Sequence, residues 1–261
     1  MKRPALPACA LLLSLVCAGS ALARDKDKVD HINFQFNGHQ RTYSVMIPST
    51  AAPTAPLAAV VLLHAQGGWA SDVMSLWHSY ASHAGFIVIA PESLSNTLWD
   101  SKVDGPDFLH AVVSDVNTKH PIDPRRVYLF GETSGGVYAL AVGLFDAQSW
   151  GGTCVHAAVL DPSNYGLFQH AAWKEPFQEW VGDNDADAPI HMMTNERDAF
   201  KAAGFPFDLR VIPNSDAAYG NVYDEVNEAC WKFFQQHQIP DNVVTPFAAA
   251  PATPAPAAPS K

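Results

Sequence analysis

Short apolar runs alternate with helical stretches along most of this chain, and this alternation constrains the fold more than any other feature. The run Ala59-Val60-Val61-Leu62-Leu63 is continuous and apolar, which is typical of a strand buried on both faces. Similar runs follow at residues 86–89, 127–130, 155–160, 177–181 and 207–212. Stretches with helical character separate them, at residues 70–83, 106–120, 137–146, 190–203 and 219–236. The pattern predicts a mostly parallel sheet with helices on both faces.

A hairpin is predicted ahead of these runs. Residues 32–36 alternate between apolar and polar side chains, and residues 41–47 form a second candidate strand. Asn37-Gly38 lies between the two, and this dipeptide favours a tight turn between antiparallel strands. We therefore expect an α/β fold with an eight-stranded, mostly parallel sheet that opens with an antiparallel hairpin.

Composition excludes several classes of protein. Hydrophobic residues make up 48% of the 261 residues and charged residues only 16%, so the chain has enough apolar surface to fold. The formal net charge is -10, and we find no cluster of Lys and Arg that would bind phosphate groups. We therefore expect neither nucleic acid nor an anionic membrane as a main partner. No Cys/His spacing typical of zinc occurs, and we expect neither a metal nor a cofactor.

Residues 1–23 have the pattern of a secretory signal peptide. Lys2 and Arg3 precede a short apolar run, and Ala21-Leu22-Ala23 resembles a cleavage site. The run is too short to span a membrane. We therefore expect a secreted or periplasmic protein. Only Cys154 and Cys230 remain after cleavage, and in an oxidising compartment we favour a disulfide slightly over two separate buried thiols.

The end of the chain also lies outside the expected domain. Residues 246–261 are nearly all Ala and Pro, which offer little to bury. The sequence thus predicts one folded domain at residues 24–243 and an Ala/Pro-rich tail at residues 244–261.

The segments that follow the predicted strands are the places to look for chemistry. In open parallel sheets, ligands bind at the carboxyl ends of the strands. The segments at these ends that carry polar residues or glycines are residues 64–68, 131–136, 182–185 and 213–219.

Several motifs along the chain resemble one enzyme family in their order and spacing. They are Leu63-His64-Ala65, Ala90-Pro91-Glu92, residues 122–128 before the glycine-rich turn, Val181-Gly182-x-x-Asp185, and Gly204-Phe205. Together they resemble the secreted esterase branch of the α/β-hydrolases, which includes polyhydroxyalkanoate depolymerases and feruloyl and acetylxylan esterases. The resemblance covers nearly the whole domain. It implies a Ser-His-Asp triad acting on a small or polymeric ester.

Two of the three triad positions depart from that family. The nucleophile turn G-x-S-x-G has Thr133 in place of serine, between Gly131 and Gly135. In the loop after the last strand, Ala217 stands where the family has the histidine that acts as base. The triad acid is present as Asp185. Alanine cannot accept a proton, and loss of either the nucleophile or the base removes most of a triad's rate contribution.

Other residues of the chain are poor candidates to replace the missing serine and histidine of the triad. Ser134 is out of register with the turn, and it fits better as an early helix residue. His64 corresponds to a structural position beside the oxyanion loop, although a role as base is an alternative. Asp183, Asp185 and Asp187 alternate as in a calcium loop, but the glycine that such a loop needs for its sharp turn is absent.

Parts of the binding apparatus are expected to survive. An oxyanion hole would use the backbone N–H of Ser134 and one from the Ala65-Gln66 segment. Trp69 and Trp99 fall near the same face of the sheet, where they either stack on an aromatic acyl group or serve only in packing.

Three functional hypotheses remain from the sequence. The chain is a pseudo-esterase that binds an ester or related ligand without turnover, an active esterase or depolymerase with a rearranged site, or an inactivated variant of an ordinary esterase. The resemblance implies a small-molecule or polymeric ester as ligand, and the sequence leaves the oligomeric state open.

Overall fold

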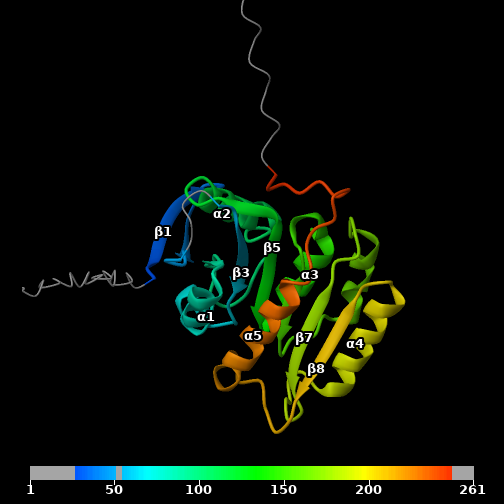
Figure 1. Cartoon of the computed structure of the whole chain (residues 1–261). Coiled ribbons are helices and arrows are strands. Elements are labelled where there is room, and N and C mark those ends of the chain that lie inside the picture. Colours follow the sequence, from blue (N-terminus) through cyan, green and yellow to red (C-terminus); the bar gives the residue numbers. More distant parts are fainter. Residues whose placement is uncertain (1–26, 51–54, 249–261) are drawn as a thin grey trace, which may run out of the picture.

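A computed structural model describes residues 27–50 and 55–248. Its centre is an eight-stranded sheet in the order β1-β2-β4-β3-β5-β6-β7-β8 (Figure 1). The strands are β1 (Val29–Phe36), β2 (His39–Met46), β3 (Leu57–Leu63), β4 (Ile87–Pro91), β5 (Ile122–Glu132), β6 (Thr153–His156), β7 (Phe177–Gly182) and β8 (Phe207–Ile212). The α-helices are α1 (Ala70–Ala84), α2 (Pro106–Asn117), α3 (Ser134–Phe145), α4 (Ile190–Ala202) and α5 (Tyr223–Phe234).

The first two strands form the predicted antiparallel hairpin. They pair from Val29↔Met46 to Phe36↔His39, and the turn uses Asn37 and Gly38 at φ values of 48° and 80°. β2 also pairs antiparallel with β4, and the other neighbouring strands pair in parallel. The predicted fold class is therefore confirmed.

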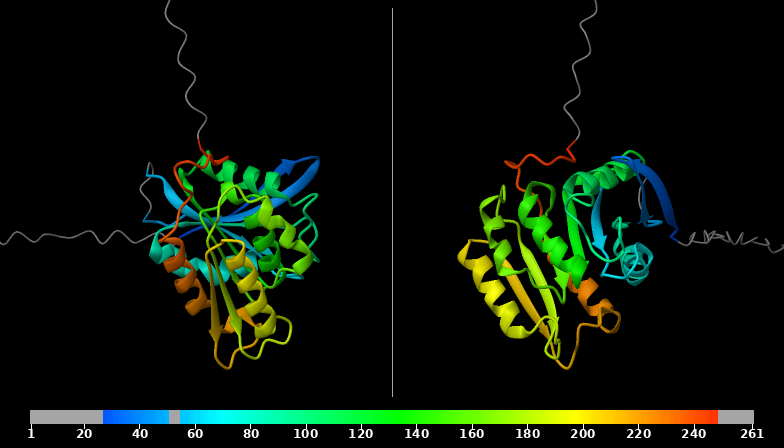
Figure 2. Two further views of the ribbon diagram at one scale, coloured as in Figure 1. Left: turned by 90° about the vertical axis from the view of Figure 1, so that its right-hand side faces the viewer. Right: turned by 180° about the vertical axis from the view of Figure 1, so that it is seen from behind.

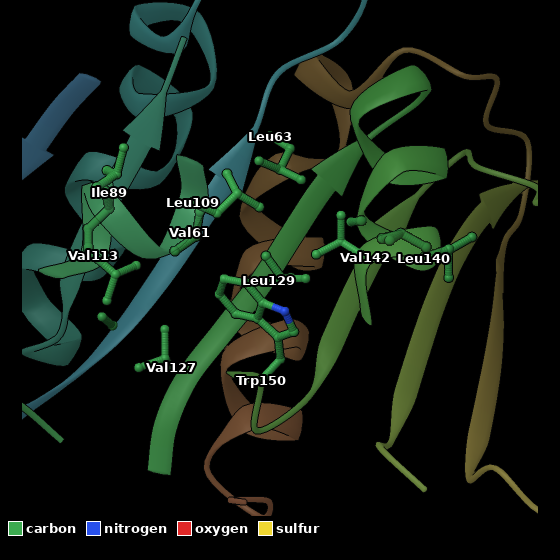
Figure 3. Packing of buried hydrophobic residues seen from close by; sticks show 14 of the residues in the cluster. Val61, Leu63, Ile89, Leu109, Val113, Val127, Leu129, Leu140, Val142 and Trp150 are labelled. Carbon is green, nitrogen blue, oxygen red and sulfur yellow. The ribbon is translucent and has the colours of Figure 1, made fainter. Parts of the chain in front are cut away.

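Helices cover both faces of the sheet (Figure 2). Alternate residues of the central strands point to opposite faces, so Leu62 and Phe130 pack with side chains of α1 and α5. Val61, Leu63 and Leu129 pack on the other face with side chains of α2 and α3 (Figure 3). Full burial of each such side chain stabilises the fold by about 1.5–3 kcal/mol relative to exposure.

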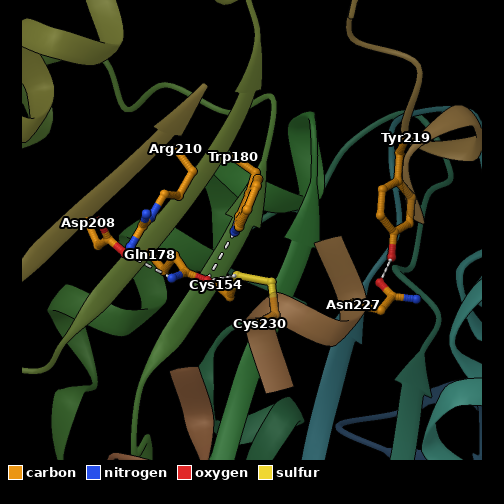
Figure 4. The surroundings of a disulfide bond; sticks show 8 residues. All are labelled: Cys154, Gln178, Trp180, Asp208, Arg210, Tyr219, Asn227 and Cys230. Carbon is orange, nitrogen blue, oxygen red and sulfur yellow. Dashed lines mark hydrogen bonds and ion pairs between the residues drawn. A yellow bond between two sulfur atoms is a disulfide. The ribbon is translucent and has the colours of Figure 1, made fainter. Parts of the chain in front are cut away.

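A disulfide joins α5 to the sheet. Cys154 of β6 and Cys230 of α5 are bonded, with their Cα atoms 5.8 Å apart (Figure 4). The bridge spans 76 residues of sequence, a separation for which the chain-entropy estimate is about 4 kcal/mol of stabilisation.

Some boundaries differ from the expected ones. The strand expected at residues 155–160 ends at His156, and residues 162–169 form a 3-10 helix that periodicity did not indicate. The packed chain also continues past residue 243, because Phe247 is buried against Trp150, with ring centroids 5.8 Å apart.

The predicted signal peptide and most of the predicted tail lie outside the described residues. Within the described ranges, none of the helices has the length and apolarity needed to cross a membrane.

Candidate functional site

The turn between β5 and α3 has the strained geometry of a nucleophile elbow. Thr133 occupies its tip at φ 46° and ψ -115°, and Ser134 is the first residue of α3. Positive φ is unfavourable for a β-branched residue and costs about 1–3 kcal/mol. The structure therefore places the side chain of Thr133, and not that of Ser134, at the tip of the turn.

The glycines on either side of Thr133 are required by close packing. A Cβ on Gly131 would lie 2.4 Å from the carbonyl oxygen of Gly135. A Cβ on Gly135 would lie 2.2 Å from the carbonyl oxygen of Leu63. Because neither gap admits a side chain, this turn can form here only with glycine at both positions.

His156, at the end of β6, is a candidate site residue that the sequence analysis missed. Its carbonyl oxygen accepts a hydrogen bond from the backbone N–H of Thr133 at 2.8 Å. Its ring is fully buried, and both ring nitrogens lack a hydrogen-bond partner among the described residues. Burial lowers the pKa of His156 to about 4, although the charges of Asp185 and Asp216 oppose this shift. His156 is therefore neutral at pH 7.

Asp185 is buried and oriented by its own loop. Its Oδ1 accepts hydrogen bonds from the backbone N–H groups of Asp187, at 2.9 Å, and Ala188, at 2.8 Å. Its Oδ2 is buried without a hydrogen-bond partner in the described part of the chain. This carboxylate is held in the manner of a triad acid, with one oxygen left to receive an N–H donor.

The loop that carries Ala217 is held against the loop of Asp185. The backbone N–H of Asn184 donates to the carbonyl oxygen of Ser215 at 2.8 Å. Gly182 packs closely against the same loop, because a Cβ at this position would lie 2.2 Å from the carbonyl oxygen of Ser215. The loops after β7 and β8 thus lie side by side. The side chain of Ala217 is only a methyl group, so it offers no proton acceptor to this site. That Thr133, Asp185 and Ala217 correspond to a triad stays a prediction.

The Ala65-Gln66 segment, which was predicted to help bind an oxyanion, contacts both residues that flank Thr133. Ser134 Oγ accepts a hydrogen bond from the backbone N–H of Gln66 at 2.6 Å. Burial and the charge of Asp72 raise the pKa of Glu132 to about 7, and the backbone N–H of Ala65, which hydrogen-bonds to it, opposes this rise. Side chains of the elbow therefore engage both amides of the Ala65-Gln66 segment, one of which was expected to bind a ligand oxygen together with the amide of Ser134.

Trp99 is a packing residue in this structure. Only 8% of its surface is exposed, and its indole N–H donates to the carbonyl oxygen of His64 at 3.0 Å. Its ring stacks on Tyr138, with ring centroids 5.5 Å apart. The expected stacking on an acyl group therefore does not fit Trp99, because protein groups already occupy its faces. Trp69 is 52% exposed and is the better candidate for ligand contact.

His64 is not placed to serve as a base. Its ring is buried, with Nδ1 2.9 Å from the carbonyl oxygen of Ala65 and Nε2 3.2 Å from Ser93 Oγ. Because both nitrogens have protein partners, we assign His64 a structural role beside the Ala65-Gln66 segment.

The aspartates after β7 do not form a metal site. Oδ1 of Asp185 is occupied by two backbone amides, and both Asp183 and Asp187 are exposed. Across residues 27–50 and 55–248, no three His, Cys, Asp or Glu side chains are grouped so that they could hold a metal ion.

A groove lies at the opposite end of the sheet from the elbow. It has a volume of about 640 Å³ and is lined by α5, β7 and β8. Pro176 and Pro206, which precede the two strands, form part of its wall. We therefore do not treat this groove as the candidate active site.

Comparison with solved structures identifies the fold. The S-formylglutathione hydrolase of Agrobacterium tumefaciens matches with a TM-score of 0.67 and 15% identity, over 80% of this chain and 95% of that one. A ferulic acid esterase matches with a TM-score of 0.63 and 13% identity, over 81% and 98%. Esterase 2 of Thermogutta terrifontis, phosphoramylated by tabun, matches with a TM-score of 0.65 and 14% identity, over 81% and 96%.

The chain therefore has the α/β-hydrolase fold and is similar in structure to esterases and other serine hydrolases. The chain also matches part of a larger protein, the dipeptidyl peptidase 4 of Porphyromonas gingivalis, with a TM-score of 0.65 and 13% identity. That match covers 82% of this chain but only 36% of the peptidase. No protein-family profile and no curated protein sequence matches the chain.

Proposed function

We propose that this chain is an exported pseudo-esterase, which binds an ester or a related carboxylic ligand and hydrolyses it very slowly or not at all. The observation that carries the proposal is the Oδ2 of Asp185, which has no hydrogen-bond partner in the described ranges and belongs to a loop that contacts the loop of Ala217. An acid oriented in this way has a role only if a base accepts a proton from the nucleophile, and alanine cannot do so. Thr133 adds a second obstacle, because its methyl group crowds the path of attack.

Export is part of the same proposal. The predicted signal peptide at residues 1–23 supports a secreted or periplasmic location, and so does the disulfide between Cys154 and Cys230. Disulfides are rare in reducing compartments and persist in oxidising ones. Mass spectrometry of the protein purified from the periplasm or medium would test the cleavage before Arg24.

The proposed function is tested by repair of the site. We expect neither the wild type, Thr133→Ser, nor Ala217→His to hydrolyse p-nitrophenyl acetate or butyrate above background. The double variant should be at least about 100 times faster than either single variant, because nucleophile and base act as a unit. An active wild type would refute the proposal. A folded but inactive double variant would show that the site has changed beyond these two positions.

A second candidate function is slow hydrolysis with Thr133 as nucleophile and His156 as base. The observations that favour it are the backbone hydrogen bond from the Thr133 amide to the His156 carbonyl oxygen and the low pKa of the buried His156 ring, which keeps the imidazole neutral at pH 7. A fluorophosphonate that labels Thr133 in the wild type, but not in His156→Leu, would support this function and contradict the first.

A further inference from the structure

All four backbone amides of the segment Ala65–Gly68 face acceptors within the protein. The N–H of Ala65 faces the Glu132 carboxylate, and that of Gln66 donates to Ser134 Oγ at 2.6 Å. The N–H of Gly67 donates to the carbonyl oxygen of Asn96 at 2.5 Å, and that of Gly68 to the carbonyl oxygen of Ala65 at 3.0 Å. A ligand oxygen that binds to this segment must therefore displace one of these acceptors.

The acceptor that can leave most readily is Ser134 Oγ. The acceptors of Gly67 and Gly68 are backbone carbonyl groups, and Glu132 is half-buried. Ser134 is held at Gln66 by one side-chain torsion, and rotation to another staggered position releases the N–H. The Gln66–Ser134 contact is also solvent-exposed, so a ligand can reach it.

The contact is not explained by capping of α3. A serine at the start of a helix commonly bonds to amides of its own first turn. Here the hydroxyl oxygen accepts from a residue 68 positions earlier in the chain, in the segment that follows β3. It occupies the position that the oxygen of a bound acyl group would take in an oxyanion hole built from Gln66 and Ser134 amides.

We propose that the Ser134 hydroxyl is an internal competitor for the oxyanion hole, so that a ligand oxygen gains by binding there only when it is anionic. This inference rests on the proposed function, since it assumes that the ligand binds at the elbow. A neutral ester carbonyl gains little by replacing a hydroxyl, because both form ordinary hydrogen bonds with Gln66. A carboxylate or phosphonate oxygen forms a charge-assisted bond that is roughly twice as strong.

The test compares ligand binding in two Ser134 variants. Phenylphosphonate is the probe, because it carries a tetrahedral anionic oxygen and cannot be hydrolysed. Ser134→Ala removes the competing oxygen, and we expect phenylphosphonate to bind about five to ten times more tightly by calorimetry, which is the value of one hydrogen bond. Ser134→Thr keeps the hydroxyl and should bind as the wild type does.

Hydrogen exchange gives a readout that is independent of the ligand. The Gln66 amide should exchange at least about ten times faster in free Ser134→Ala than in the wild type or in Ser134→Thr. Ser75→Ala is the matched control, because it removes an exposed serine hydroxyl bonded at 2.7 Å to the carbonyl oxygen of Asp72 in α1. It should change neither the affinity nor the exchange of Gln66.

Equal or weaker phosphonate binding in Ser134→Ala would overturn the inference, as would no binding to either protein at millimolar concentration. Ester hydrolysis by the wild type would refute the proposed function instead. It would leave the comparison of Ser134 variants unaffected.

Discussion

The backbone N–H of Thr133 donates to the carbonyl oxygen of His156 at 2.8 Å, so the end of β6 supports the strained turn of the elbow. The ring of His156 packs against Tyr219, with ring centroids 5.4 Å apart, and Tyr219 lies two residues after Ala217. His156 therefore connects the nucleophile turn with the loop that carries the base in related enzymes.

The buried ring of His156 should make the protein less stable in acid. Its pKa is about 4 in the folded state, against 6.5 for an unperturbed histidine. Between these values the unfolded chain binds the proton that the folded chain excludes, so the free energy of unfolding falls as pH falls. Urea unfolding at pH 7 and pH 4.5 should show a loss for the wild type that is about 2 kcal/mol larger than for His156→Leu.

His156→Phe provides the control for packing. Its stability at pH 7 will differ from that of His156→Leu, because the two side chains fill the space differently. Both variants should nevertheless show the same reduced pH dependence. An unchanged acid dependence in both would mean that His156 does not titrate as described.

A buried pair of carboxyl groups should make the protein less stable as pH rises, which is the opposite of the effect of His156. Glu179 of β7 and Glu196 of α4 are both buried, and three of their four oxygens have no hydrogen-bond partner among the described residues. Glu196 Oε1 accepts the N–H of Leu160 at 2.8 Å. Burial raises the pKa of Glu196 to about 7, and burial together with the neighbouring Glu196 raises that of Glu179. The pair therefore holds a proton near neutral pH.

A raised carboxyl pKa reduces stability as pH rises. From about 4.5 to about 7, the folded chain keeps a proton that the unfolded chain has released, so the free energy of unfolding falls through this window. Glu196→Gln should therefore be more stable than the wild type at pH 8 by about 2 kcal/mol, with a smaller gain at pH 5. The charges of Glu196 and Glu179 also act on Tyr165, and Tyr165→Phe serves as the control. An equal gain in the free energy of unfolding by Glu196→Gln at pH 5 and pH 8 would contradict the conclusion that the pair holds a proton near neutral pH.

Much of the fold could be predicted from the sequence, because strands buried on both faces leave continuous apolar runs and the turn residues lie between them. The tip of the elbow was also predictable, since Gly131 and Gly135 mark it. His156 was not, because it lies within the apolar segment Val155–Leu160, and nothing in that segment indicates that the strand ends at residue 156. The signal that could have found it is the polar side chain itself, which is the one titratable group within an otherwise apolar segment.

Contacts between residues far apart in the chain could not be predicted from the sequence. The bond between Gln66 and Ser134 depends on how two loops meet after folding. The burial of Trp99 depends on the loop before α2, where the buried ion pair of Arg41 and Asp104, 2.6 Å between charged atoms, fixes the backbone. Neither arrangement is indicated by the periodicity or the composition of the sequence.

The strain at Thr133 can be measured by substitution with glycine. Glycine adopts a φ near 46° without a steric penalty, so Thr133→Gly should raise the free energy of unfolding by about 1 kcal/mol. Ala157, at φ 52°, is a matched position at the end of the neighbouring strand, and Ala157→Gly should also stabilise the protein, though less because alanine is not β-branched. A loss of stability in Thr133→Gly would show that contacts of the threonine side chain outweigh its strain.

Exogenous imidazole should partly replace the missing base. In Thr133→Ser the nucleophile is a primary hydroxyl, but no group at position 217 accepts its proton. The Asp185 Oδ2 is buried and unpartnered within the described residues, and the side chain of Ala217 is smaller than an imidazole ring. Imidazole bound there would donate one N–H to Asp185 and accept the serine proton with its other nitrogen, as the histidine of a triad does.

The rate of p-nitrophenyl acetate hydrolysis by Thr133→Ser should therefore rise with imidazole concentration and then saturate, about tenfold or more above the rate without imidazole. Imidazole also cleaves this ester in solution, but that rate grows linearly and can be subtracted. Thr133→Ser/Asp185→Asn should lose the saturating part, because an amide at this position cannot stabilise the imidazolium that forms. The wild type should respond weakly, since the methyl group of Thr133 hinders attack. A purely linear dependence in Thr133→Ser would mean that the space at Ala217 does not admit an imidazole ring, and that Asp185 has no access to a base.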